Sequence, residues 1–215
     1  TLYSFARQNL RWFIVSATLL ALMRPEGSIM AIIAVLLYGI RAYQQGHLMR
    51  RLMWLGLPTF AIVIQPTLNL LLTGSVSSTG NQAKSILSMI PGDRDVIIER
   101  ILDNFVRTWA EFATGTGGEF LPLMIFPFAL VGFIIMLLNR ETRYTALLIA
   151  GWMIAVSGAI ATLDTAFWHF KRYQVPLIAL FFPLAAIGVW WFSLRISGSF
   201  STRFLRRIRV GLTAL

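Results

Sequence analysis

Residues 19–37 read LLALMRPEGSIMAIIAVLL, and they decide the fold because four polar or helix-breaking residues interrupt a long apolar run. Arg24, Pro25, Glu26 and Gly27 separate the two hydrophobic segments. In a membrane, charge at such a place is costly unless it reaches water or a partner. The stretch therefore predicts a turn between two helices, with Arg24 and Glu26 at a membrane surface.

The composition is that of a membrane protein. Of the 215 residues, 57% are hydrophobic and 13% are charged, whereas a soluble domain is about 45–50% apolar and about 25% charged. The sequence contains no cysteine, no nucleotide-binding glycine loop and no histidine pair at metal-ligand spacing, so no metal site is predicted. We expect an all-α integral membrane protein with one transmembrane domain over residues 1–215, forming the C-terminal part of a longer chain.

Six apolar segments predict about six transmembrane or re-entrant helices. They cover residues 12–23, 27–40, 52–72, 120–138, 145–163 and 175–194. The last four are long enough to cross a hydrocarbon core of about 30 Å at about 1.5 Å per residue. The first two would cover only about 18–21 Å, so they form either short spans or a re-entrant hairpin. In both cases the chain returns to its starting side.

The charges give this arrangement a direction. With a cytoplasmic N-terminus, 12 of the 19 basic residues and one of the nine acidic residues fall on the cytoplasmic side. This bias follows the positive-inside rule. The net charge of +10 is then mainly a signal of topology, and nucleic acid is not an expected partner.

A long extracytoplasmic loop over residues 73–119 has two different halves. Residues 73–94 are rich in Gly, Ser and Thr and are expected to be irregular. Residues 95–113 predict an amphipathic helix that lies on the membrane surface or roofs the bundle, or that serves only as a scaffold. Its apolar stripe is Ile97, Ile98, Ile101, Leu102, Phe105, Trp109 and Phe112.

The stretch DTAFWHFKRYQVP, residues 164–176, is a candidate binding site. Lys171 and Arg172 lie on the side opposite to the positive-inside bias and next to His169. Such basic residues suit a lipid phosphate, which arginine holds with two parallel hydrogen bonds. The alternative is an aromatic belt, including Tyr173, with basic side chains that reach to the membrane surface.

Two further places carry polar residues on the same side. Arg24 faces an anionic ligand, with Glu26 orienting it, or both belong to a solvated turn. Asn69 interrupts an apolar run and contacts either substrate or a neighbouring helix. Lys84 follows a flexible loop and either approaches a substrate or is simply solvated.

The order of these motifs resembles bacterial membrane glycosyltransferases of the GT-C fold, similar to dolichyl-phosphate-mannose-protein mannosyltransferases and arabinofuranosyltransferases. The resemblance rests on Arg24-Pro25-Glu26-Gly27 between two apolar helices, and on two later patterns. These are Asn69, Thr73-Gly74 and Ala83-Lys84, and then His169, Arg172, Tyr173 and Pro176 before a final helix.

The resemblance implies transfer of a sugar from a polyprenyl-phosphate donor to a glycan, lipid or protein acceptor, at the outer face of the bacterial cytoplasmic membrane. Arg24, His169, Lys171, Arg172 and Tyr173 would bind the donor phosphate. Glu26, Asn69 and Lys84 would contact the substrate from the loops.

This interpretation does not identify the catalytic residue. In the family, an acidic residue in the first extracytoplasmic loop acts as general base or binds the acceptor, and that loop is expected to precede this stretch of chain. Asp164 or Glu26 is a weaker candidate for the same role. The need for a divalent cation in the full-length enzyme is left open. A lipid flippase, ligase or transporter and a non-catalytic membrane scaffold are the alternative functions.

Overall fold

The computed structural model describes residues 1–23, 25–46, 48–76, 84–89, 93–115, 121–164 and 173–199. These residues are mainly helical, and their one β-type contact is an isolated antiparallel bridge between Ser85 and Leu163. Their helices are α1 (Leu2–Ala6), α2 (Leu10–Met23), α3 (Pro25–Gln44), α4 (Leu48–Thr73), α6 (Ile86–Met89), α7 (Arg94–Thr114), α8 (Ile125–Leu138), α9 (Arg143–Ala161) and α10 (Val175–Ser199).

Four helices are long and apolar enough to cross a membrane. The qualifying stretches are Gly27–Gln44, Met53–Thr73, Arg143–Ala161 and Val175–Ile196. Two shorter apolar helices, α2 and α8, have 14 residues each. The coarse expectation of a helical membrane protein is therefore confirmed.

Most helices do not end where the predicted apolar segments end. Helix α2 begins at Leu10, α4 begins at Leu48 and α10 continues to Ser199. The second segment was expected to end at residue 40, but α3 has 20 residues and continues to Gln44. Arginine is a good helix former, so its charge does not end the helix. The Arg41 guanidinium lies over the ring of Tyr144, 5.3 Å from its centroid. Hydropathy alone stops at the charged residue and does not detect this partner.

The fourth segment is shorter than predicted. A helix was expected from residue 120, but Leu121 to Met124 form a turn and α8 begins at Ile125. Pro127 therefore lies in the first turn of the helix, where a missing backbone N–H leaves no hydrogen bond unmade. The four preceding residues count as apolar in a hydropathy window although they are not helical.

Small residues bring α2 and α3 together in a tight hairpin. A Cβ atom at Gly27 would lie 2.2 Å from the carbonyl oxygen of Leu20, so only glycine fits there. The Ser28 hydroxyl donates to the carbonyl oxygen of Ala21 at 3.0 Å. Pro25 is the first residue of α3, a favoured position for proline. The turn in the opening stretch is thus explained by close packing.

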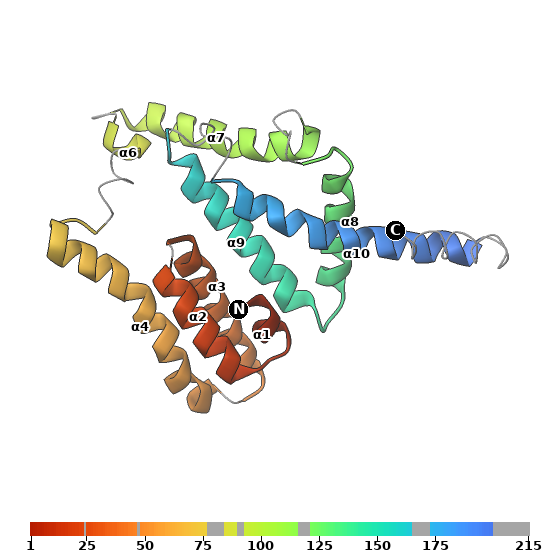
Figure 1. Cartoon of the computed structure of the whole chain (residues 1–215), viewed down its shortest axis with the longest axis horizontal. Helices are drawn as coiled ribbons and strands as arrows, with labels where there is room; N and C mark the ends of the chain where they lie inside the picture. Colours follow the sequence, from red (N-terminus) through yellow and green to blue (C-terminus); the bar gives the residue numbers. More distant parts are fainter. Residues whose placement is uncertain are drawn as a thin grey trace.

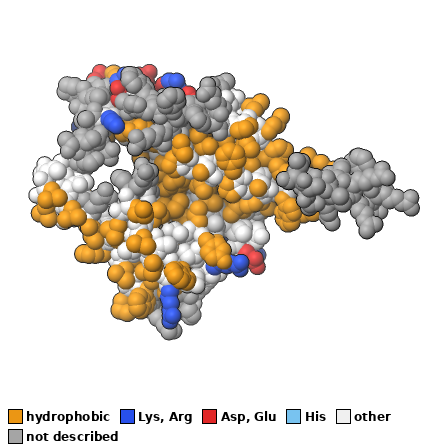
Figure 2. Space-filling view, viewed as in Figure 1, with side chains coloured by type: hydrophobic (Ala, Val, Ile, Leu, Met, Phe, Trp, Pro, Cys, Tyr) orange, Lys and Arg blue, Asp and Glu red, His pale blue; other side chains and the backbone are white. Residues whose placement is uncertain are grey.

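The helices form two groups that meet at α3 and α9. Helix α4 packs against α2 and α3, whereas α8 and α10 share the most extensive contact of the fold. Tyr144 at the start of α9 donates a hydrogen bond to the amide oxygen of Gln44 at the end of α3. Helix α7 runs across the other end of α9 (Figure 1). Hydrophobic side chains cover the middle of the visible face, and charged side chains gather along α7 and at the opposite end (Figure 2).

Helices α8 and α10 cross in direct backbone contact. A Cβ atom at Gly132 would lie 1.9 Å from the carbonyl oxygen of Leu184, and one at Gly188 would lie 2.0 Å from that of Phe128. Close approach at small residues is a main source of helix association in membranes, where burial of apolar surface provides no driving force between helices. The pair Gly132 and Gly188 therefore fixes how α10 lies on α8.

Replacing Gly132 by alanine is expected to lower the free energy of unfolding by about 1–3 kcal/mol, because the added methyl group forces the two backbones apart. Denaturant titration of the purified protein in detergent, followed by circular dichroism, measures this. Gly158→Ala is the matched control, since a Cβ atom there meets nothing within 4 Å, and it should be neutral or stabilising. Equal effects of the two substitutions would contradict the proposed crossing.

Candidate functional site

Helix α7 has well-defined ends. The Asp93 carboxylate accepts from the backbone N–H groups of Asp95 and Val96, at 3.2 and 3.5 Å. Gly115 ends the helix in the left-handed conformation, with φ of 67°, as glycine commonly does. The structure thus places the helix at Arg94–Thr114, within one residue of the predicted range at each end.

One flank of α7 packs on the bundle and another remains exposed. Thr108 and Phe112 are buried, and the Phe112 and Trp109 rings lie 5.1 and 6.4 Å from the ring of Phe181 in α10. Ile98 and Leu102, expected in the same stripe, are instead 54% and 57% exposed. The helix therefore roofs the bundle with only part of its apolar surface.

Polar contacts hold α7 against the end of α9. The Asn104 amide nitrogen donates to the carbonyl oxygen of Ala161 at 3.1 Å, one of the last carbonyls of α9. Arg100 lies 3.7 Å from the Asp164 carboxylate, with both side chains at least one-third exposed. An exposed ion pair contributes only about 0–1 kcal/mol, so the Asn104 hydrogen bond is the stronger anchor.

A short segment of the long loop pairs with the chain that leaves α9. The backbone N–H of Ile86 donates to the Thr162 carbonyl at 2.8 Å, and that of Asp164 donates to the Lys84 carbonyl at 2.9 Å. Ile86 is 1% exposed, so its side chain anchors the segment. The sequence predicts an irregular chain here and misses both this pairing and the short helix α6.

This pairing places Lys84 against Tyr173, 89 positions further along the chain. The Lys84 ammonium donates to the Tyr173 hydroxyl oxygen at 3.2 Å and lies 5.9 Å from the ring centroid. Both side chains are partly buried. Within the described part of the chain, no carboxylate forms an ion pair with Lys84.

The chemistry of this pair suits an anion. A lysine ammonium has three donor hydrogens, so two remain after the bond to Tyr173. The tyrosine oxygen accepts that bond, which leaves its own hydrogen to donate. Two neighbouring donors and one positive charge are the groups that bind a phosphate or carboxylate.

Gln174 is a polar residue that the sequence interpretation missed. Its side chain is 1% exposed, and both amide atoms are buried without a hydrogen-bond partner in the described structure. A buried polar group without a partner costs about 1–3 kcal/mol, and a bound water or polar ligand commonly supplies the partner. The only sequence signal is a glutamine immediately before an apolar helix.

Of the eight predicted binding residues, the structure shows Lys84 and Tyr173 in contact. Asn69 in α4 instead donates to the carbonyl oxygen of Val76 at 3.5 Å, a contact within its own segment. Glu26 belongs to α3, but its side chain lies outside the described residues. The remaining four, which lie wholly outside the described residues, are Arg24, His169, Lys171 and Arg172.

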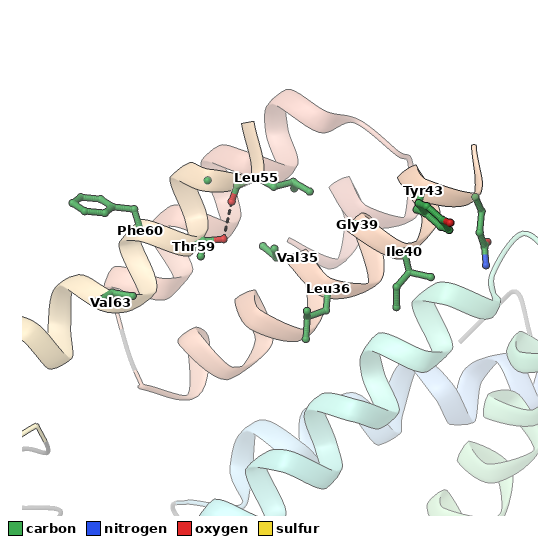
Figure 3. A pocket seen from close by; sticks show the side chains of 11 residues that line it. Val35, Leu36, Gly39, Ile40, Tyr43, Leu55, Thr59, Phe60 and Val63 are labelled. Carbon is green, nitrogen blue, oxygen red and sulfur yellow. Dashed lines mark hydrogen bonds between the residues drawn. The ribbon is translucent and has the colours of Figure 1, made fainter. Parts of the chain in front are cut away.

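A large apolar groove lies elsewhere, between α3 and α4 (Figure 3). Its volume is about 970 Å³, and Gly39 and Gly56 leave open space beside it. The only polar group that Figure 3 links by a hydrogen bond is Thr59, whose hydroxyl donates to the Leu55 carbonyl at 2.9 Å. The groove lies in the group of α2, α3 and α4, away from the polar contacts at the end of α9. We therefore place the candidate site at Lys84 and Tyr173, where those polar contacts lie.

Comparisons with family models, with curated proteins and with solved structures give no match for this chain. Among the residues that the structure describes, no group of three histidine, cysteine, aspartate or glutamate side chains is arranged to hold a metal ion. The geometry around Lys84 and Tyr173 therefore provides the starting point for a functional proposal.

A double-mutant cycle with Lys84→Met and Tyr173→Phe should give a coupling energy of about 0.5–1.5 kcal/mol, the usual net value of a hydrogen bond. Unfolding of the two single variants and the double variant in detergent measures this coupling.

Tyr144→Phe is the matched control for the cycle, because Tyr144 binds Gln44 at the end of α3. Its coupling to Lys84→Met should be close to zero. Strict additivity of Lys84→Met and Tyr173→Phe would contradict the contact.

Proposed function

We propose that the chain is part of a membrane glycosyltransferase of the GT-C class, which transfers a sugar from a polyprenyl-phosphate donor. The observation that carries the proposal is the contact between Lys84 and Tyr173. The two residues come from separate motifs that resemble this class of enzyme, and together they present a positive charge and a hydroxyl donor. A sugar phosphate needs both kinds of group.

The reaction gives these residues a defined task. The acceptor hydroxyl oxygen forms a bond to the anomeric carbon, and the bond from that carbon to the phosphate oxygen breaks. A general base removes the hydroxyl proton, and the polyprenyl phosphate leaves with the electron pair. Lys84 and Tyr173 stabilise the negative charge that develops on the leaving phosphate. In enzymes of this class the base is an acidic residue of another loop, so Lys84 and Tyr173 are assigned only to the leaving phosphate.

The arrangement of helices supports a site at one membrane face. The Lys84–Tyr173 contact lies beside the end of α9, where Asn104 holds α7. In our proposal all six apolar helices sit in the bacterial cytoplasmic membrane, with the start of the chain in the cytoplasm. Helix α7 and the donor phosphate then lie on the extracytoplasmic side, with Arg172, Lys171, His169 and Arg24 adding to the phosphate site.

The test is sugar transfer by the full-length protein with polyprenyl-phosphate donors. Lys84→Met and Arg172→Ala should each lower turnover about ten- to a hundredfold, the range expected when a charged hydrogen bond to the leaving group is lost. Lys84→Arg keeps the charge and should retain more activity than Lys84→Met.

Arg94→Ala, at the exposed start of α7, should leave turnover unchanged. Full turnover by both Lys84→Met and Arg172→Ala would overturn the phosphate role. Donor binding without any transfer by the full-length protein would favour a lipid carrier instead, and absence of donor binding would favour a scaffold.

A further inference from the structure

Gln174 holds a buried amide group at the start of α10. Its carbonyl oxygen accepts from the backbone N–H groups of Leu177 and Ile178, both at 3.0 Å, so the backbone is fixed by the helix. The side chain continues the buried face of α10, because Leu177, Ile178 and Phe181 follow at helical spacing and are at most 8% exposed. Only the amide at the end of the side chain is left without a hydrogen-bond partner in the described structure.

The lack of a partner for this amide does not result from an open surface. The Gln174 side chain is 1% exposed, so bulk solvent does not reach the amide. A further part of the protein that docked on the surface would not reach it either. A buried amide without a partner destabilises the folded protein. The partner that remains is a small molecule that enters this part of the fold.

Other unpaired polar groups lie in the same helix group. In the part of the chain that the structure describes, buried side-chain atoms without a partner belong to Gln174, Ser157 in α9, Trp109 in α7 and Thr18 in α2. Helices α7 and α10 both pack on α9, and the Trp109 ring meets that of Phe181 in α10 at 6.4 Å. Of these residues, Thr18 alone lies in the other helix group. The unpaired groups therefore concentrate in the helices beside the candidate site.

The residue before Gln174 is Tyr173, which belongs to the candidate anion site. Lys84 donates to the Tyr173 hydroxyl oxygen at 3.2 Å. Consecutive Cα atoms are about 3.8 Å apart, so the Gln174 amide and the Lys84–Tyr173 pair belong to one small region of the fold. A ligand larger than a phosphate therefore meets both.

The chemistry of the amide selects the kind of group that it binds. A glutamine amide has one oxygen that accepts and two N–H hydrogens that donate. A phosphate diester only accepts, so it would leave the amide oxygen unpaired. A hydroxyl group both donates and accepts, so sugar hydroxyls can satisfy both ends of the amide.

We propose that Gln174 binds hydroxyl groups of the sugar, while Lys84 and Tyr173 hold the phosphate of the same donor. The inference rests on the proposed function, to which it adds the residue that recognises the sugar. Because the amide is closed off in this structure, sugar binding includes a local movement of the side chains that cover it. A ligand without hydroxyl groups leaves the amide unpaired and is rejected for that reason.

Equilibrium binding of two lipids to the full-length protein in detergent tests the proposal. One lipid is the methyl diester of undecaprenyl phosphate, which has the charge of a donor but no sugar. The other is undecaprenyl phosphate that carries mannose, glucose, galactose or arabinose, whichever binds most tightly. Gln174→Met should weaken binding of the sugar-bearing lipid about fivefold, the loss of about one hydrogen bond, and should leave the methyl diester unchanged. Microscale thermophoresis measures both affinities.

Three comparisons separate an effect on the sugar from other effects. Lys84→Met should weaken both lipids to a similar extent, because both carry the phosphate. Gln44→Met is the matched control and should change neither affinity, since the Gln44 amide already accepts from Tyr144 at the other end of α9. Gln174→Met should unfold at the same or a higher denaturant concentration than the wild type, because an unpaired buried amide is removed.

Each contrary outcome has a defined meaning. Wild-type affinity of Gln174→Met for the sugar-bearing lipid would overturn the proposal and leave ordered water as the partner of the amide. Equal weakening of both lipids by Gln174→Met would also overturn it, since the amide would then act on the phosphate or on the fold. In either case a loss of affinity in Lys84→Met still supports the phosphate site. Failure of the wild-type protein to bind both lipids would contradict the proposed function as well.

Discussion

The hydrogen bond from Asn104 to the carbonyl oxygen of Ala161 is the contact on which the candidate site depends. At a helix end the last carbonyl groups have no partner within the helix, and near lipid no water replaces one. The amide of Asn104 supplies a partner at 3.1 Å and thereby holds α7 across α9. The adjoining residues Thr162 to Asp164 then pair with residues 84–86, which brings Lys84 to Tyr173.

Several of these features could be predicted from the sequence because they depend on local pattern. The alternation of apolar and charged residues predicts α7 almost to the residue. Lys84 stands out as a basic residue after a polar loop, and Tyr173 as an aromatic residue just before an apolar segment. The structure places the two in contact. Composition alone predicts a helical membrane protein, which the four long apolar helices support.

Other features depend on partners far away in the sequence, and no local pattern reveals them. Arg41 at the end of α3 lies over the ring of Tyr144 in α9, a residue far away in the sequence. The backbone contact at Gly132 becomes visible only when α10 is placed on α8. The buried amide of Gln174 looks like an ordinary polar residue before a helix, and only its burial shows that it needs a partner.

The central claim is that α7 and the turn between α8 and α9 lie on opposite faces of a membrane. The chain has no cysteine, so single cysteines can be introduced at exposed positions without a background, as Asp103→Cys in α7 and Glu141→Cys in the turn. A membrane-impermeant maleimide added to intact spheroplasts should label position 103, and should label position 141 only after permeabilisation. Equal labelling of both positions in intact spheroplasts, or labelling of position 141 alone, would contradict the account.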